Sequence, residues 1–103
     1  MNVEGVIIRQ ILVEKIDETR KHSLNIPARC RENQYWAVWT CAPSSFDWHY
    51  DQKEIAYIFE GKVRIKTATQ EVCLEPGDLV TFPAGLSCTW EIIDRISKVY
   101  RFE

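Results

Sequence analysis

The sequence predicts a single all-β domain, a sandwich or barrel of short strands with at most one short helix near its N-terminus. Two observations support this prediction. From Tyr35 onward, segments that alternate apolar and polar residues, or that are rich in β-branched and aromatic residues, follow one another. Proline and glycine turn signals separate these segments about every 8–12 residues. The chain has 103 residues, which suffices for one modest core and is too short for two.

The first third of the chain is expected to hold one strand and the helix. Residues 6–15 (VIIRQILVEK) are apolar and β-branched with little 3.6-residue periodicity, which favours a strand. Asp17 can cap the amides that follow it, so a short helix or turn is predicted over residues 17–25, before Pro27. His22 is expected to be exposed in this polar segment, and residues 28–34 to form an exposed connection.

The rest of the chain is expected to be strands and turns. YWAVWTCAP is predicted to be a strand that stops at Pro43, followed by a turn at Ser44 and Ser45. Residues 55–59 (IAYIF) are apolar on both faces, which is typical of a strand covered on two sides. KVRIKT, EVCLE and LVTF are predicted as further strands, with turns at 76–78 and 83–85. Two further strands are predicted, one with an apolar face at residues 86, 88, 90 and 92, and a final one over about residues 96–102. The predicted strands number about eight in all.

Composition argues against several classes of function. The hydrophobic share is 46% and the charged share 27%, which is ordinary for a globular protein. A net charge of −2 gives no electrostatic reason to expect nucleic acid or an anionic membrane as partner. No apolar run approaches the roughly 20 residues of a transmembrane helix. The first residues, MNVEGVIIRQ, lack the features of a signal peptide, so a cytoplasmic protein is expected.

The cysteines predict neither a zinc site nor a redox pair. Cys30, Cys41, Cys73 and Cys88 form no CxxC pair and no cluster with histidine at zinc-site spacing. Four free thiols are therefore expected, of which Cys30, Cys41 and Cys73 are expected to be packing residues.

Two segments carry glycine and proline at fixed spacings. Residues 46–61 hold Glu54 followed by Gly61, and residues 77–92 hold Gly77, Pro83 and Gly85. This pattern resembles the two signature motifs of the cupin superfamily, HxHxxxExxxxxxG and GxxxxxPxGxxH. The segments WHYDQKE, FEGKV, PGDLVTFPAGLSCTW and SKVYRF are similar to small single-domain cupins such as the (S)-ureidoglycine aminohydrolase cupin domain and the ethanolamine-utilisation cupins. The resemblance implies a cupin double-stranded β-helix, a jelly-roll barrel, spanning residues 1–103.

The resemblance also implies where a metal would bind, and the sequence departs from the family there. Trp48, Tyr50 and Cys88 stand at the three histidine positions, and Glu54 alone keeps the family identity. Indole cannot bind a metal, and a phenol does so only when deprotonated. We therefore expect no tightly bound metal and no other cofactor.

A β-bulge is the alternative that would restore a metal site. It would turn Asp47 and His49 inward to join Glu54. Without it, strand alternation leaves His49 facing solvent.

Glu54 is the candidate for acid–base chemistry. If it points inward, Ala56 and Ile58 share its face and aromatic residues lie close in sequence, so its carboxylate is partly desolvated. Such a group could be a general acid or base, or could anchor a ligand. The alternative is a structural glutamate bonded to Tyr50 or to backbone amides.

Other candidates lie on the later strands. Cys88 could be a weak nucleophile, but no histidine is identifiable nearby to activate it, so a packing thiol is favoured. Trp48 and Trp90, at motif positions, are predicted to line a cavity. Lys98 and Tyr100 share a face, in a stretch that resembles the closing Lys-x-Tyr of the subfamily. Lys98 either lines the site or lies at its rim.

These residues predict a protein that binds a small polar molecule in an aromatic barrel cavity. The expected binding residues are Trp48, Tyr50, Glu54, Cys88, Trp90, Lys98 and Tyr100. Two alternatives are a manganese-dependent enzyme similar to ureidoglycine aminohydrolase, and a structural or regulatory module with a filled barrel. A homodimer is also expected, because IAYIF and VIIRQILV offer more apolar surface than one small barrel covers.

Overall fold

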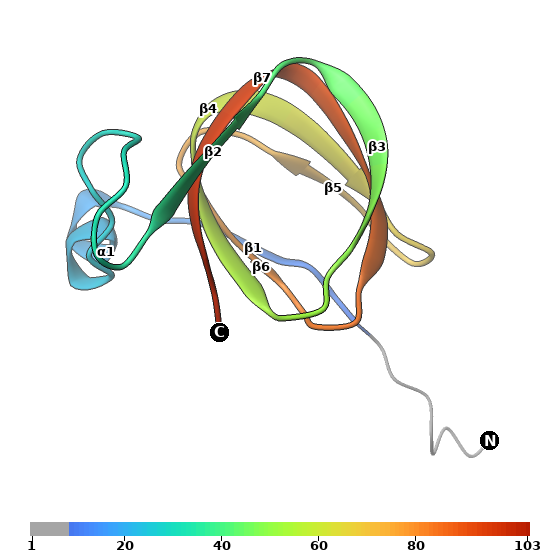
Figure 1. Ribbon diagram of the computed structural model, residues 1–103, viewed down its shortest axis with the longest axis horizontal. Helices are drawn as coiled ribbons and strands as arrows, with labels where there is room; N and C mark the ends of the chain where they lie inside the picture. The colour runs from blue at the N-terminus through green and yellow to red at the C-terminus, as the bar shows by residue number, and fades with distance from the viewer. Residues whose placement is uncertain (1–8) are drawn as a thin grey trace.

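The strands of the protein curl into a barrel, as Figure 1 shows for the computed structural model, which describes residues 9–103. The strands are β1 (Leu12–Lys15), β2 (Ala37–Cys41), β3 (Ser44–His49), β4 (Glu54–Lys66), β5 (Glu71–Leu74), β6 (Asp78–Phe82) and β7 (Ser87–Phe102). They form one antiparallel sheet in the order β1-β6-β4-β7-β2, with β3 also paired to β7 and β5 to β4. The prediction of an all-β jelly-roll fold is confirmed.

The two longest strands, β4 and β7, form the wall on which the site is built. Their pairing runs from Glu54 opposite Phe102 to Lys66 opposite Thr89, with register shifts near Gly61. The sequence predicted each of these strands as two shorter ones, and that prediction was wrong. Gly61 marks a bulge within a continuous strand, where the chain bends without leaving the sheet. The two mergers reduce the eight predicted strands to six, and β3, which was not predicted, brings the strands in the described residues to seven.

Gly61 has a structural reason to be glycine. Its φ is 106°, in a region that other residues rarely adopt. A Cβ added there would lie 2.5 Å from the carbonyl oxygen of Arg95 on β7. The absence of a side chain at Gly61 thus allows β4 and β7 to approach each other closely.

The N-terminal elements match the prediction in part. Helix α1 (Glu18–Ser23) is capped by Asp17, whose carboxylate accepts a 2.9 Å hydrogen bond from the Arg20 amide. β1 is shorter than the predicted strand over residues 6–15, of which residues 6–8 lie outside the described part of the chain.

Ser44 and Ser45 begin β3 and do not form the predicted turn. No helix in residues 9–103 has the length and hydropathy needed to cross a membrane.

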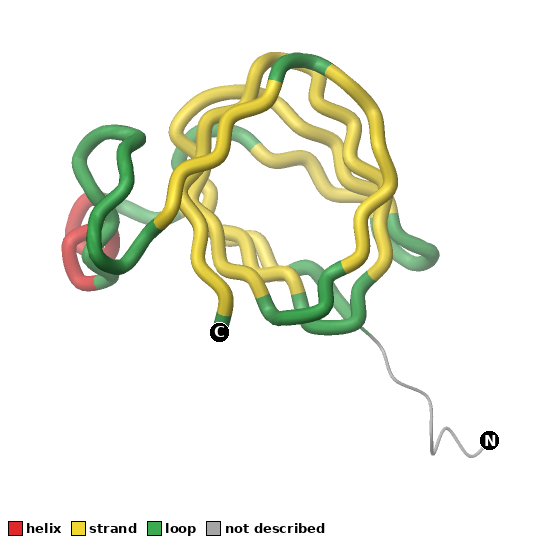
Figure 2. Tube along the Cα trace, in the orientation of Figure 1, coloured by secondary structure: helices red, strands yellow, loops and turns green. Residues whose placement is uncertain are grey.

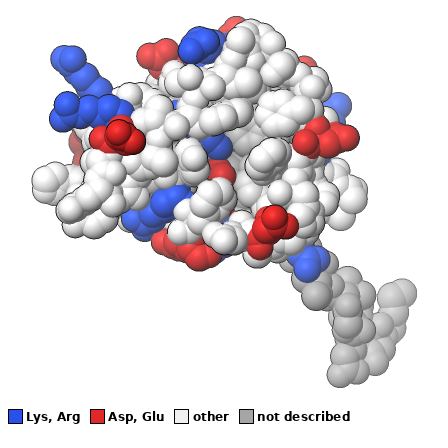
Figure 3. Space-filling view, in the orientation of Figure 1, with Lys and Arg blue, Asp and Glu red and all other residues white. Residues whose placement is uncertain are grey.

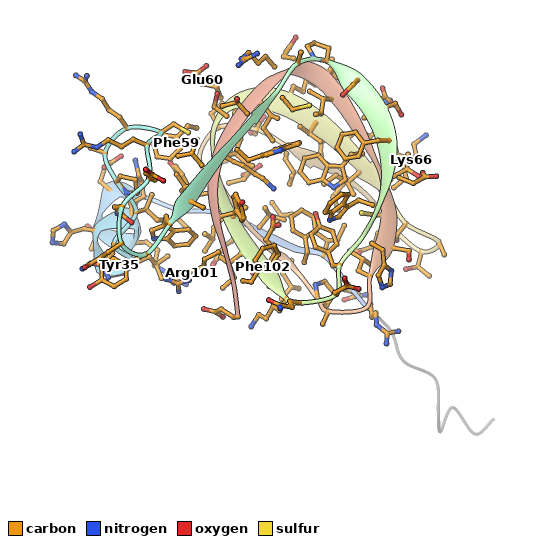
Figure 4. The ribbon with its side chains drawn as sticks, in the orientation of Figure 1. Tyr35, Phe59, Glu60, Lys66, Arg101 and Phe102 are labelled. Atoms are coloured by element: carbon orange, nitrogen blue, oxygen red, sulfur yellow. The ribbon has the colours of Figure 1, made fainter. Side chains whose placement is uncertain are left out.

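Apolar side chains pack on both sides of the barrel wall. One cluster fills part of the interior and includes Ala56 and Ile58. A second lies on the outer side and includes Tyr57 and Trp36. Figure 2 shows α1 and the connection after it outside the ring of strands, and Figure 4 places Phe59 on this side. The two-sided apolar segment IAYIF is therefore covered within a single chain.

Candidate functional site: a cavity inside the barrel

A cavity of about 210 Å³, called here the barrel cavity, lies between β2, β3, β4 and β7. Figure 3 shows a hollow near the middle of this face, where basic and acidic atoms lie together among uncharged side chains. A cavity of this size has room for several water molecules or for a small metabolite. Seven aromatic and two charged residues line it: Trp39, Phe46, Trp48, Tyr50, Glu54, Trp90, Lys98, Tyr100 and Phe102.

The two charged residues of the cavity form a buried ion pair. Lys98 Nζ donates a 2.8 Å hydrogen bond to Glu54 Oε2, and each residue is only 5% exposed. Lys98 comes from β7 and Glu54 from the first position of β4. Lys98 therefore lies inside the barrel and not at its rim. The partner of Glu54 is this ammonium group, neither Tyr50 nor the backbone amides that the sequence suggested.

Aromatic rings surround the ammonium group of Lys98. Its Nζ lies 4.9 Å from the ring centroid of Trp90, 5.0 Å from that of Trp39 and 5.4 Å from that of Tyr100. Trp39 stands directly opposite Lys98 in the β2–β7 pair, which explains its place in the wall. Ring faces attract a cation at these distances and also keep water away from it. Burial lowers the pKa of Lys98 below its ordinary value, and the nearby Glu54 carboxylate opposes that shift.

Tyr50 is held in the cavity wall by stacking and by one hydrogen bond. Its ring stacks on Phe82 at 4.6 Å, and its hydroxyl accepts a 3.2 Å hydrogen bond from Trp90 Nε1. Burial, and then the Glu54 carboxylate, raise the pKa of Tyr50 far above the usual value for a phenol. The phenol is therefore neutral at physiological pH.

Cys88 packs in the interior cluster and does not line the barrel cavity. Burial raises the pKa of its thiol to about 11. The thiol is therefore protonated at neutral pH, as a packing residue would be, and a protonated thiol is a poor nucleophile.

Two exposed aromatic residues, Trp48 and Phe102, lie at the mouth of the cavity. Trp48 lines it but is 53% exposed, so it sits at the opening and not deep inside. Tyr100 lines the wall as predicted. Phe102, which is 52% exposed and is seen near the end of β7 in Figure 4, also lies at the opening.

Sequence reasoning missed three wall residues, Trp39, Phe46 and Phe102. Signals were available for two of them. Phe46 is two positions before Trp48, and Phe102 is two after Tyr100, so alternation places each on the same face as a predicted wall residue. Trp39 carried no such signal, because its place depends on the register between β2 and β7.

The residues of this chain do not fit the metal site that the cupin fold implies. Asp47 and His49 point outward, where they contact Thr89 and Ser87 with 2.8 Å and 2.7 Å hydrogen bonds, so the inward bulge alternative was wrong. Within residues 9–103 no group of three or more His, Cys, Asp or Glu side chains is placed to hold a metal ion. Glu54 is paired with an ammonium group, which would repel a cation at the same place.

Comparison with known proteins decides the family. The family model of the EutQ-like cupin domain matches residues 30–100. The chain belongs to the EutQ-like cupin family. This cupin is similar to a DUF861 family protein from Thermotoga maritima, with 35% identity and a TM-score of 0.81 over 91% of this chain and 100% of the other.

Two more distant structures share the fold of this EutQ-like cupin. The EutQ protein of Clostridium difficile has 22% identity and a TM-score of 0.60, over 65% of this chain and 53% of that one. A putative ethanolamine utilization protein Q from Salmonella typhimurium has 14% identity and a TM-score of 0.60, over 89% and 68%. At such identities the similarity supports the fold alone. Comparison with curated proteins finds no significant match.

Proposed function

We propose that this EutQ-like cupin binds a small, uncharged polar molecule in the barrel cavity, without a tightly bound transition metal. The Glu54–Lys98 pair on the cavity wall is the observation that carries the proposal. Burying two charges carries a desolvation cost even when they are paired, and apolar residues of similar volume would pack a core at least as well. The charges of Glu54 and Lys98 balance each other, so a ligand with a net charge would leave one unit uncompensated.

The pair retains capacity for further hydrogen bonds. An ammonium group has three donors and a carboxylate about four acceptor positions, and the pair uses one of each. A ligand that carries a donor and an acceptor on one polar group, such as an amide, can therefore bond to both Glu54 and Lys98. The aromatic walls favour a flat or apolar remainder.

The other functions considered find less support. The barrel is not completely filled by side chains, since the cavity of about 210 Å³ remains, and this argues against a purely structural module. A manganese-dependent reaction similar to that of ureidoglycine aminohydrolase needs metal ligands that the site residues do not provide.

Two further expectations also remain proposals. A homodimer is supported by the edge strand β1, whose Leu12 is 62% and Val13 38% exposed. A cytoplasmic location is supported by the four unpaired cysteines, because oxidising compartments favour disulfides.

A thermal-shift screen of uncharged polar metabolites, followed by calorimetric titration, tests the binding proposal. Trp48→Ala at the mouth is expected to weaken a hit about tenfold, or about 1.4 kcal/mol, with little loss of stability because Trp48 is half exposed. Tyr35→Ala is the matched control, since Tyr35 is an exposed aromatic residue that does not line the cavity. A hit that binds Trp48→Ala and Glu54→Gln as tightly as the wild type would contradict the proposal.

A further inference from the structure

Lys98 differs from the other buried lysine of the structure in what its amine faces. Lys21 is also buried, with Nζ 5.0 Å from the ring centroid of Tyr57, but it pairs with the exposed Glu18 and lines none of the described pockets. Lys98 instead lies on the wall of the barrel cavity. A small molecule that enters the cavity therefore meets the Lys98 amine directly.

The surroundings of Lys98 match the needs of a nucleophilic amine. Amine attack requires the neutral form, and burial of Lys98 favours that form by lowering its pKa. It also requires a partner that takes up and returns protons. Glu54 Oε2 lies 2.8 Å from Nζ, within the range for direct proton transfer. Lysines desolvated in apolar pockets are the ones that form covalent adducts with carbonyl compounds.

We propose that Lys98 captures small, uncharged aldehydes or ketones in the barrel cavity as a Schiff base, with Glu54 moving the protons. This inference rests on the proposed binding function of the cavity. The aromatic walls would hold the apolar part of the carbonyl compound, and the cavity volume limits it to a small molecule.

The reaction needs no other reactant. The Lys98 ammonium group gives a proton to the Glu54 carboxylate, and the nitrogen lone pair then forms a C–N bond to the carbonyl carbon. The carbonyl oxygen takes the proton from Glu54, which next accepts a second proton from the nitrogen. Glu54 returns this proton to the hydroxyl group, which leaves as water while the C=N bond forms. The product is a protonated imine, so its positive charge still faces the Glu54 carboxylate.

Reductive trapping with benzaldehyde and sodium cyanoborohydride tests the inference on the wild-type chain. Intact mass and peptide mapping at neutral pH are expected to show one benzyl group per chain, on Lys98, added at least ten times faster than on Lys21. Lys21→Arg should keep this labelling, and Lys98→Arg should remove it. The wild-type map alone locates the adduct, so the test stands even if Lys98→Arg fails to fold.

Benzyl alcohol, which has the same ring without the carbonyl group, separates this inference from the proposed function. It is expected to change the tryptophan fluorescence of the wild type and to slow the labelling of Lys98. If benzyl alcohol binds but benzaldehyde labels only the exposed lysines, the Schiff-base inference is wrong and the binding function stands. If benzyl alcohol and the metabolites of the thermal-shift screen all fail to bind and Lys98 is not labelled, both are wrong.

Discussion

Replacing either member of the Glu54–Lys98 pair should destabilise the fold strongly, while replacing both should not. Glu54→Gln preserves the shape of the side chain, but it leaves the ammonium group of Lys98, a residue that is 5% exposed, without its counter-ion. Lys98→Met likewise leaves the buried Glu54 carboxylate without its counter-ion. Removing one partner of a buried pair costs about 3–5 kcal/mol, whereas replacing both with uncharged residues is often close to neutral. We expect the double variant to be more stable than either single one, with a coupling energy of at least about 2 kcal/mol.

Guanidinium and thermal denaturation near neutral pH measure this cycle. A loss of 1 kcal/mol lowers the Tm of a domain of this size by about 4–8 °C, so each single variant should lose about 12 °C or more. The exposed Glu14–Arg20 pair is the control, because Glu14→Gln should change stability by less than about 1 kcal/mol. Single variants that each cost less than about 1 kcal/mol, and whose effects add, would refute the reasoning.

The pH dependence of the same variants tests the electrostatic cause. Burial lowers the pKa of Lys98 in the folded state, and removing Glu54 takes away the group that opposes this shift. Between the lowered pKa of Lys98 in the folded state and its ordinary value of 10.5, the unfolded chain binds more protons than the folded chain. The stability of the fold therefore rises with pH in this range. The difference in unfolding free energy between the wild type and Glu54→Gln should therefore become smaller from about pH 7 to about pH 10. Glu54→Gln combined with Lys98→Met should lack that trend.

Four further predictions follow from other parts of the molecule. At about pH 8, a thiol reagent should modify the exposed Cys73 and leave Cys88 unmodified until the protein unfolds, because burial raises the pKa of Cys88 to about 11. Peptide mapping would identify the modified cysteine, and equal rates of modification at Cys73 and Cys88 would contradict the prediction. Gly61→Ala should lower the free energy of unfolding by more than about 2 kcal/mol, because the added Cβ would lie against the Arg95 carbonyl. Gly77→Ala should lower it by less, because the added Cβ contacts only the flexible side chain of Lys15. A larger loss for Gly77→Ala than for Gly61→Ala in denaturation would contradict this reasoning. Sedimentation is expected to show a dimer at micromolar concentration, and a monomer at high micromolar concentration would count against it. Elemental analysis of protein purified without a histidine tag is expected to show no stoichiometric transition metal, and close to one manganese, iron, nickel or zinc per chain would reverse that view.

Alternation and motif spacing predicted the fold class and the inward-facing side of several strands. Cys88, Trp90 and Ile92 were placed on one face and are buried there. Alternation identifies the face but not the depth of a residue along the barrel. Trp48 illustrates this difference, because it was predicted to line the cavity and does so at the open end, half exposed.

The ion pair could not be predicted from the sequence. Glu54 and Lys98 are 44 positions apart, and their meeting depends on the register between β4 and β7. Residues 54–58 pair continuously with residues 102–98, and the register shifts near Gly61 begin only after Ile58. Alternation shows which residues of a strand face inward, but it does not show which residues of a distant strand lie opposite them.

The central position of β7 has a consequence for how the barrel folds. β7 pairs with β2, β3 and β4, yet it follows all of them in the sequence. Strand β4 can pair with β5 and β6 before β7 is made, but β2 and β3 have no partner in the described sheet until β7 is present. Contacts between residues far apart in sequence also form slowly. The tryptophan walls stay apart until then, so the rise of tryptophan burial in a refolding experiment would report the arrival of β7 and the formation of the cavity in a single step.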